Sequence, residues 1–201
     1  MTIALRRAGA IAALLLCCMP APARAQADWL LVPFMGVKFG GSTSIVDLEL
    51  AAGETTFNVG AATSLLSQGI FGVEVEFSYI PGYFERGQRE LVTSSYVVDL
   101  TGSLIITVPP SVTREGLRPY AVAGAGVIHA EASDILDVFR IRRSVPALVL
   151  GGGAMGFLTD RTGVRFDVRY LRSLSVDDEQ LVAIGRRISY WRGTIGIMRR
   201  F

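Results

Sequence analysis

The chain is strongly apolar, yet beyond residue 25 it holds no apolar run long enough to cross a membrane as a helix. Its mean hydropathy is +0.41. The longest uncharged candidate, residues 145–158, is interrupted by four glycines within 151–156. A spanning helix needs about 20 consecutive apolar residues. Lipid offers the backbone no hydrogen-bonding partner, so the other permitted spanning structure is a closed β-barrel. The sequence therefore favours a barrel.

The first 25 residues have the order of a secretory signal peptide. Two arginines precede an apolar run that ends at Met19, and a stretch of small residues ends at Ala25. We expect cleavage after Ala25, with Ala27 as the second choice. The predicted organisation is a signal peptide over 1–25 and one outer-membrane barrel domain over 26–201.

Cleavage there changes what the composition implies. Both cysteines, Cys17 and Cys18, would be removed, leaving a mature protein without thiols or disulfides. A lipoprotein is disfavoured, because a small residue normally precedes the lipidated cysteine and Leu16 is not small.

Three arginines would also be lost, leaving 17 basic against 18 acidic residues. A nearly neutral chain gives no reason to expect nucleic-acid binding. No metal-ligand spacing or phosphate-binding loop is present, so no cofactor is expected.

Alternating apolar and polar residues, bounded by turn residues, predict eight strands. They cover residues 29–40, 55–64, 68–80, 94–108, 117–130, 145–158, 162–173 and 188–201. Most are long enough to cross a bilayer at a tilt, which takes about 9–11 residues. The predicted fold class is all-β, an eight-stranded antiparallel up-and-down transmembrane β-barrel.

The connections between these strands alternate between long and short. Long polar stretches follow the first, third, fifth and seventh strands, at 41–54, 81–93, 131–144 and 174–187. Shorter connections follow the second, fourth and sixth, at 65–67, 109–116 and 159–161. Outer-membrane barrels have long extracellular loops and short periplasmic turns, so we expect both mature termini in the periplasm. The stretch from Ile135 to Ile141 is compatible with either a short helix or an extension of its hairpin.

Alternation alone does not separate a membrane barrel from a soluble one, since both alternate. Residues 120–128 and 145–158 are more informative, because they carry no charge on either face, whereas a water-facing sheet should carry some. We expect their small residues to leave room in the lumen for long side chains from strands 68–80 and 162–173. These small residues are Ala121, Ala123, Ala125, Gly151 and Gly153.

Aromatic residues near the strand ends fit the two interfacial girdles of a membrane barrel. The set expected at the periplasmic end is Trp29, Phe71, Tyr120 and Phe201. The set expected at the outer end is Phe39, Tyr79, Tyr96, Tyr170 and Trp191.

The chain resembles the small outer-membrane β-barrel superfamily, which includes the outer membrane protein A, X and W types. The motifs that carry the resemblance are Trp29-x-x-x-Pro33-Phe34-x-Gly36-x-Lys38-Phe39-Gly40-Gly41, Arg118-Pro119-Tyr120-Ala-Val-Ala-Gly124-Ala-Gly126-Val127 and the terminal Phe201. The resemblance implies that the last strand is read by the barrel-assembly machinery. The residues that fit this signal are Trp191, Ile195, Ile197 and Phe201. Arg199 stands in the same register, at a position that is usually apolar.

Eight charged residues on the predicted strands are expected to face the lumen. They are Lys38, Glu74, Glu76, Asp99, Arg165, Asp167, Arg169 and Arg192. Cations and anions are equal in number, as expected if side chains fill a narrow barrel and each charge needs a partner. We favour a network that closes the lumen. The alternative is a small porin-like channel for apolar or small polar solutes, with selectivity set by these charges.

An enzymatic function is the weaker hypothesis. Outer-membrane lipid A hydrolases use a histidine, a serine and a carboxylate, and His129 lies near Glu131 and Ser133 in sequence. Adjacency in sequence does not establish the hydrogen-bond reach that general-base catalysis requires. We therefore expect a non-enzymatic protein of the bacterial outer membrane with a structural or surface-interaction role. Its expected partners are outer-membrane lipid and lipopolysaccharide, whose phosphates the loop arginines can contact. The sequence leaves its oligomeric state open.

Overall fold

The computed structural model describes residues 27–43, 55–83, 92–113, 116–134, 140–174 and 188–201. The predicted signal peptide therefore lies outside the described residues. Eight strands follow one another along the chain: Asp28–Thr43 (β1), Thr56–Leu66 (β2), Phe71–Pro81 (β3), Val92–Thr107 (β4), Arg118–Asp134 (β5), Arg140–Phe157 (β6), Thr162–Ser173 (β7) and Ile188–Arg200 (β8). A short helix, Pro110–Thr113 (α3), lies between β4 and β5. It was not predicted.

Each strand pairs antiparallel with its neighbour in the chain, and β1 pairs with β8, so the sheet closes into a barrel. The closing seam runs from Leu30 opposite Arg200 to Thr43 opposite Ile188, with an irregularity between Phe39 and Ser42. The predicted number of strands, their order and the up-and-down topology are confirmed. Closure matters physically, because it leaves no strand edge with unpaired backbone groups.

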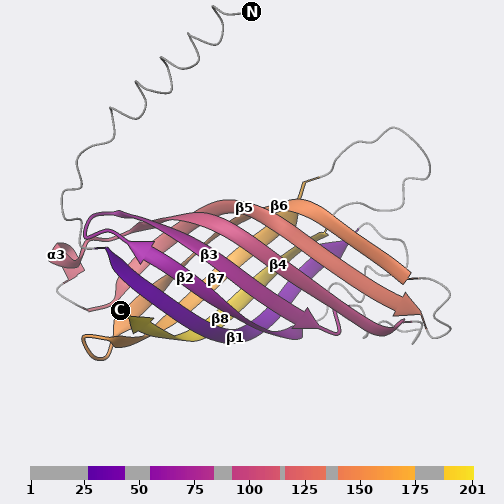
Figure 1. Ribbon diagram of the computed structural model, residues 1–201, viewed down its shortest axis with the longest axis horizontal. Helices are drawn as coiled ribbons and strands as arrows, with labels where there is room; N and C mark the ends of the chain where they lie inside the picture. The colour runs from indigo at the N-terminus through magenta and orange to yellow at the C-terminus, as the bar shows by residue number, and fades with distance from the viewer. Residues whose placement is uncertain (1–26, 44–54, 84–91, 114–115, 135–139, 175–187) are drawn as a thin grey trace, which may run out of the picture.

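The two ends of the barrel differ, and we name them by their connections. The short-turn end carries the tight turns after β2 and β6, the α3 connection after β4, the start of β1 and the end of β8 (Figure 1). The turns are closed by backbone hydrogen bonds such as Ser67 N to Phe71 O, at 3.0 Å, and Leu158 N to Thr162 O, at 2.9 Å. The opposite end is the long-loop end.

The predicted boundaries of one hairpin are wrong. Residues 131–144 were expected to form a loop, but β5 and β6 continue to the pair Ser133 and Arg140. Ile141 lies in β6, which agrees with the hairpin extension that the sequence left open, whereas residues 135–139 lie outside the described residues. The backbone ladder between β5 and β6 continues beyond the point where the apolar alternation that reveals a strand in sequence has ended.

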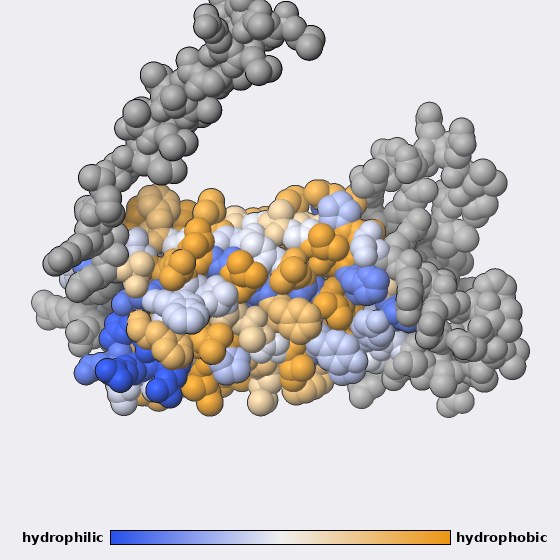
Figure 2. Space-filling view, viewed as in Figure 1, coloured by the Kyte–Doolittle hydropathy of each residue, from blue (hydrophilic) through white to orange (hydrophobic). Residues whose placement is uncertain are grey.

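The outer wall of the barrel is apolar and its interior contains the charges. Along β3, Val73, Val75 and Phe77 are exposed, whereas Glu74 and Glu76 are buried, with only 2% and 3% of their surface accessible. Apolar side chains cover most of the face seen in Figure 2, and charged residues gather near the short-turn end. A soluble barrel would have the opposite arrangement, so the distribution of side chains is that of a barrel surrounded by lipid.

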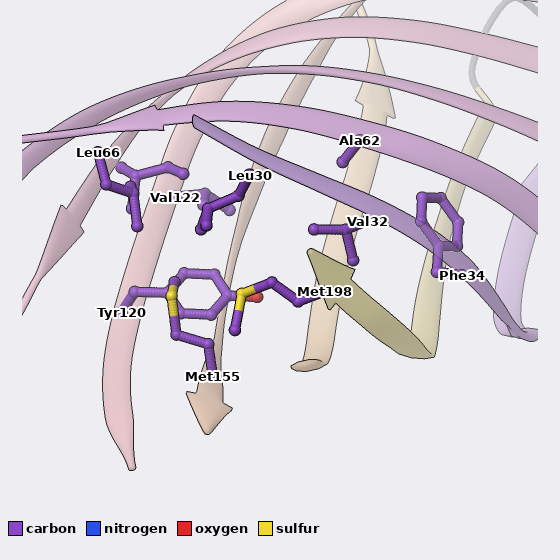
Figure 3. Packing of buried hydrophobic residues seen from close by; sticks show 10 residues of the cluster. Leu30, Val32, Phe34, Ala62, Leu66, Tyr120, Val122, Met155 and Met198 are labelled. Carbon is purple, nitrogen blue, oxygen red and sulfur yellow. The ribbon is translucent and has the colours of Figure 1, made fainter. Parts of the chain in front are cut away.

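The interior is divided into three layers along the barrel axis. An apolar layer at the short-turn end contains Leu30, Tyr120, Met155 and Met198 (Figure 3). A second apolar cluster lies toward the long-loop end and includes Leu171 and Tyr190 among its members. The charged residues occupy the inward positions between them, and this layering was not predicted.

The small residues of β5 and β6 do not all face the lumen. Gly151 and Gly153 do, as expected: a Cβ atom added to Gly151 would lie 2.8 Å from Arg169 Cγ, and one added to Gly153 would lie 2.7 Å from the Tyr120 hydroxyl. The prediction is wrong for Ala121, Ala123 and Ala125, which are exposed on the outer wall. The inward small residues of β5 are Gly124 and Gly126, because alternation begins from the buried Arg118.

Among the described residues, no helix has the length and apolar character required to cross a membrane.

Candidate functional site

The structure places all eight charged residues assigned to the lumen inside the barrel. Each has at most 5% of its surface accessible: Lys38, Glu74, Glu76, Asp99, Arg165, Asp167, Arg169 and Arg192. They come from five strands, β1, β3, β4, β7 and β8, and each occupies an inward position of the strand alternation. A charge in such a dry interior is costly unless it is paired and hydrogen-bonded, so the geometry of their contacts decides what they do.

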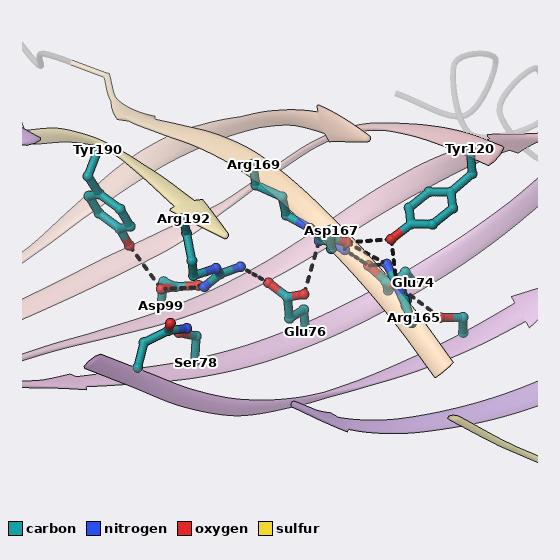
Figure 4. A network of polar contacts seen from close by, with 12 residues as sticks. Glu74, Glu76, Ser78, Asp99, Tyr120, Arg165, Asp167, Arg169, Tyr190 and Arg192 are labelled. Carbon is teal, nitrogen blue, oxygen red and sulfur yellow. Dashed lines mark hydrogen bonds and ion pairs between the residues drawn. The ribbon is translucent and has the colours of Figure 1, made fainter. Parts of the chain in front are cut away.

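One half of the network joins β3 to β7. Arg165 and Arg169 both contact Glu74, the latter with Nη2 at 2.6 Å from Oε1. The same two arginines hold Asp167, with Arg165 Nη2 at 3.0 Å and Arg169 Nε at 2.7 Å from its carboxylate oxygens. Ser64 of β2 also donates to Glu74 at 2.7 Å. Two carboxylates and two guanidinium groups thus share a single cluster (Figure 4).

The other half joins β8 to β3 and β4. Arg192 contacts Glu76 and places Nη1 at 3.1 Å from Asp99 Oδ1. The two halves meet at Glu76, whose Oε2 lies 3.2 Å from Arg169 Nη1. Arg169 and Arg192 therefore share one carboxylate, and seven of the eight residues form a continuous chain of ion pairs across the lumen (Figure 4).

Lys38 is the residue that these ion pairs do not include. It lies beside Arg192 in the register of β1 and β8, and its ammonium group is 4.2 Å from the centroid of the Tyr83 ring. The structure therefore brings together three arginines and four acids, while Lys38 contacts an aromatic ring. A cation over an aromatic face is attracted by the ring's quadrupole, so this contact stabilises the ammonium group inside the barrel.

Two tyrosines of the network were not predicted from the sequence, because only charged residues were assigned to it. Tyr120 donates to Asp167 at 2.6 Å and accepts from Arg165 Nε at 2.6 Å. Tyr190 donates to Asp99 at 2.9 Å. Tyr120 was expected in an interfacial girdle, which is wrong, since only 6% of its surface is accessible. The signal for its orientation was available, because residues 118, 120 and 122 share one face of a strand.

His129 contacts a serine, but not the one near it in sequence. Its Nδ1 lies 2.8 Å from Ser144 Oγ, across the β5–β6 pair, whereas Ser133 pairs in register with Arg140. Glu131 accepts a hydrogen bond from the Tyr96 hydroxyl at 2.6 Å. No carboxylate among the described residues contacts the imidazole. A histidine–serine pair is present, but within the described part of the chain the carboxylate that orients the base in a catalytic triad is not in place.

The residues assigned to the assembly signal lie along the outer wall of β8. Trp191, Ile195, Ile197 and Phe201 are all exposed. The rings of Trp191 and Tyr170 are 5.0 Å apart, as are those of Phe201 and Trp29, so an aromatic pair lies near each end of the outer wall of β8. The guanidinium of Arg199 lies 5.8 Å from the Phe201 ring centroid. Its charge therefore lies near the end of the strand, beside an aromatic ring.

Within the described ranges, no group of three or more histidine, cysteine, aspartate or glutamate side chains is arranged to hold a metal ion. The carboxylates of the lumen are instead occupied by arginines. The function of this site is electrostatic: its ion pairs hold β3, β4, β7 and β8 together and fill the barrel between two apolar layers.

An eight-stranded antiparallel barrel with an apolar wall and charges inside belongs to the class of small outer-membrane barrels. The family model described as outer membrane protein beta-barrel domain matches residues 10–187. The chain belongs to this family and is a protein of the bacterial outer membrane.

Solved structures agree on the fold. Neisserial surface protein A superposes with a TM-score of 0.62 at 12% identity, over 87% of this chain and 97% of the other. OprG from Pseudomonas aeruginosa has a TM-score of 0.60 at 15% identity, over 87% and 96%. The N-terminal barrel domain of OprF from the same organism has a TM-score of 0.51 at 16% identity, over 88% and 100%. No curated protein sequence matches the chain. At these identities the likeness concerns the fold alone.

Proposed function

We propose that the chain is a closed outer-membrane barrel that acts through its surfaces, in a structural or surface-interaction role, and does not conduct solutes. The observation that carries this proposal is the ion network of Glu74, Glu76, Asp99 and Asp167 with three arginines, stacked between two apolar layers. The side chains that a channel would use to attract ions are bonded to one another across the lumen.

The small channel, the alternative raised by the sequence, fits this interior less well. A hydrated solute entering from the short-turn end would first meet Tyr120, Met155 and Met198. It would then have to separate Arg169 and Arg192 from the carboxylate that they share, Glu76. Each step removes hydration or breaks a buried pair, and both are costly in a low-dielectric interior.

Planar-bilayer recording of the refolded protein tests the closed lumen. We expect no stable unitary conductance, because the network and its flanking layers leave no hydrated path. An open porin recorded in the same membranes provides the control for sensitivity. Reproducible unitary steps from this protein, with selectivity that follows the lumen charges, would establish the channel and refute the closed barrel.

The proposed orientation places the short-turn end, and with it both mature termini, in the periplasm. It is supported by the difference between the connections at the two ends, since outer-membrane barrels keep their short turns inside. The long-loop end then meets lipopolysaccharide. Near that end the wall carries Tyr170, Trp191 and the exposed Arg172, a combination of interfacial aromatics and a guanidinium suited to lipid phosphates.

The proposal also makes the protein non-enzymatic. The hydrogen bond between His129 and Ser144 is the one arrangement of the described residues that resembles part of a hydrolase. Glu131, the carboxylate considered with it, is engaged by Tyr96. A structural role accounts for the same contact, in which a histidine near the base of a loop forms a hydrogen bond with a neighbouring hydroxyl.

Deletion of Phe201 tests the proposed role of β8 in assembly. We expect strongly reduced amounts of heat-modifiable barrel in the outer membrane, because the terminal aromatic of the proposed signal is lost. Phe71→Ala, at the start of β3, is the matched control, since it removes an equally exposed aromatic side chain from the same end of the barrel outside the signal. The role in assembly is refuted if both variants reach the outer membrane in equal amounts while folding equally well in detergent.

A further inference from the structure

A pocket of about 210 Å³ opens at the short-turn end of the lumen. Its walls come from the ends of four strands: Asp28 begins β1, Arg118 begins β5, Phe157 ends β6 and Arg200 ends β8. The β6–β7 turn, residues 158–160, completes it. Segments far apart in the sequence thus converge on one small cavity that holds two guanidinium groups.

Arg118 is the unusual member of this pocket. Only 3% of its surface is accessible, although it stands at the first position of a strand. Its Nε donates to the Val108 carbonyl at 3.1 Å, which fixes the plane of the guanidinium. Its Nη2 is buried and has no hydrogen-bond partner among the described residues. A buried charged donor left without a partner is costly, which points to a missing acceptor.

The acid and the second cation of the pocket are already engaged with each other. Arg200 places Nη1 at 3.5 Å from Asp28 Oδ2 and donates Nε to the Asp160 carbonyl at 2.7 Å. Its guanidinium also lies 4.9 Å from the centroid of the Phe157 ring. Arg200 is therefore held in place beside the pocket, and Asp28 is paired with it. The buried donor of the pocket that lacks a hydrogen-bond partner among the described residues belongs to Arg118.

The pocket is blind. Two positions deeper along each of the four strands stands a buried apolar or aromatic side chain: Leu30, Tyr120, Met155 and Met198. These residues form the inner layer that separates the pocket from the ion network. A molecule at this mouth therefore meets an apolar layer before it reaches the ion network.

We propose that this pocket binds a small oxyanion, a phosphate or carboxylate group, with the Arg118 guanidinium as its principal ligand and Arg200 beside it. A planar guanidinium presents a fork of donors that matches two oxygens of such a group. A water molecule occupies about 30 Å³ in the liquid, so a cavity of about 210 Å³ has room for an oxyanion together with several water molecules. This inference adds a ligand site to the closed barrel and does not depend on whether the lumen conducts.

Titration of the refolded protein in a phosphate-free maltoside detergent tests the proposal. With ¹⁵N-labelled arginine, the Arg118 side-chain resonance is expected to shift saturably with inorganic phosphate or with acetate. Calorimetry on Arg118→Met is expected to show affinity for inorganic phosphate reduced by about tenfold or more, because a charge-assisted contact is lost. Arg161→Met, at an exposed arginine of the adjacent turn, should stay within about twofold.

A second arm identifies the source of the oxyanion. Phosphate binding at Arg118 is measured in nanodiscs with and without phosphatidylglycerol. Competition by this lipid would assign the site to a lipid headgroup, whereas unchanged phosphate binding would assign it to a soluble oxyanion. Heat-modifiable mobility shows whether Arg118→Met folds, and the wild-type resonance shift needs no variant. Absence of a saturable shift in the wild type, or equal phosphate affinity in folded Arg118→Met, would overturn the proposal.

Discussion

Replacing Arg169 with methionine is expected to lower the free energy of unfolding by about 3–5 kcal/mol, the cost of breaking a buried ion pair by removing one partner. Arg169 is fully buried and contacts Glu74, Glu76 and Asp167. Methionine keeps much of the volume but leaves these three carboxylates with only two arginines. The uncompensated negative charge would remain in a dry interior between two apolar layers, where it has no solvent to stabilise it.

Urea unfolding of the refolded barrel in lipid vesicles, extrapolated to zero denaturant, measures this loss. Arg161→Met is the matched control, because Arg161 is exposed and lies outside the network. Its effect should stay within about 0.5 kcal/mol. If both variants lose the same stability, the ion pairs contribute nothing measurable and the lumen is more hydrated than its geometry indicates.

The alternation of the strands made the number of strands and the location of the lumen charges predictable. In β3, Val73, Val75 and Phe77 could only face lipid if Glu74 and Glu76 faced inward, and the structure has this arrangement. A period of two residues is a local property of the backbone, so sequence is enough to assign the two faces. Which arginine meets which carboxylate depends on the register between distant strands, and local alternation carries no such information.

The same limit explains the errors in β5. Ala121, Ala123 and Ala125 were assigned inward because they are small, and Tyr120 outward because it is aromatic. In the structure the three alanines lie on the outer wall and Tyr120 faces the lumen, because Tyr120 is two residues from the buried Arg118 and shares its face of the strand. In a segment without charges both faces look apolar, so composition does not tell wall from lumen. The apolar inner layers were missed because several of their members, such as Val122 and Val149, lie in these charge-free segments. The Arg118 pocket was missed because it forms only when four strand ends meet.

Val75→Arg is expected to cost about 2–4 kcal/mol in a lipid bilayer, the penalty for a cation on the lipid face near the midplane of a barrel. Val75 stands in the middle of β3, is 53% exposed, and has Thr63 and Gly102 as its register partners. An exposed valine on a water-facing sheet would tolerate arginine with little loss. The size of the penalty therefore reports the solvent around the wall directly.

The matched control is Val112→Arg in α3, because Val112 is also exposed, at 69%, but lies at the short-turn end outside the strands. We expect its effect to stay within about 0.5 kcal/mol. Unfolding can also be measured in vesicles of increasing hydrocarbon thickness. The loss of unfolding free energy caused by the arginine should grow with thickness only at Val75, because only a residue held in hydrocarbon moves further from the interface. Equal tolerance at the two positions would mean that the apolar wall does not face lipid. A large difference would show that lipid surrounds the wall of the barrel. Lipid outside then explains both why the apolar residues of β3 are exposed and why its charged residues are buried.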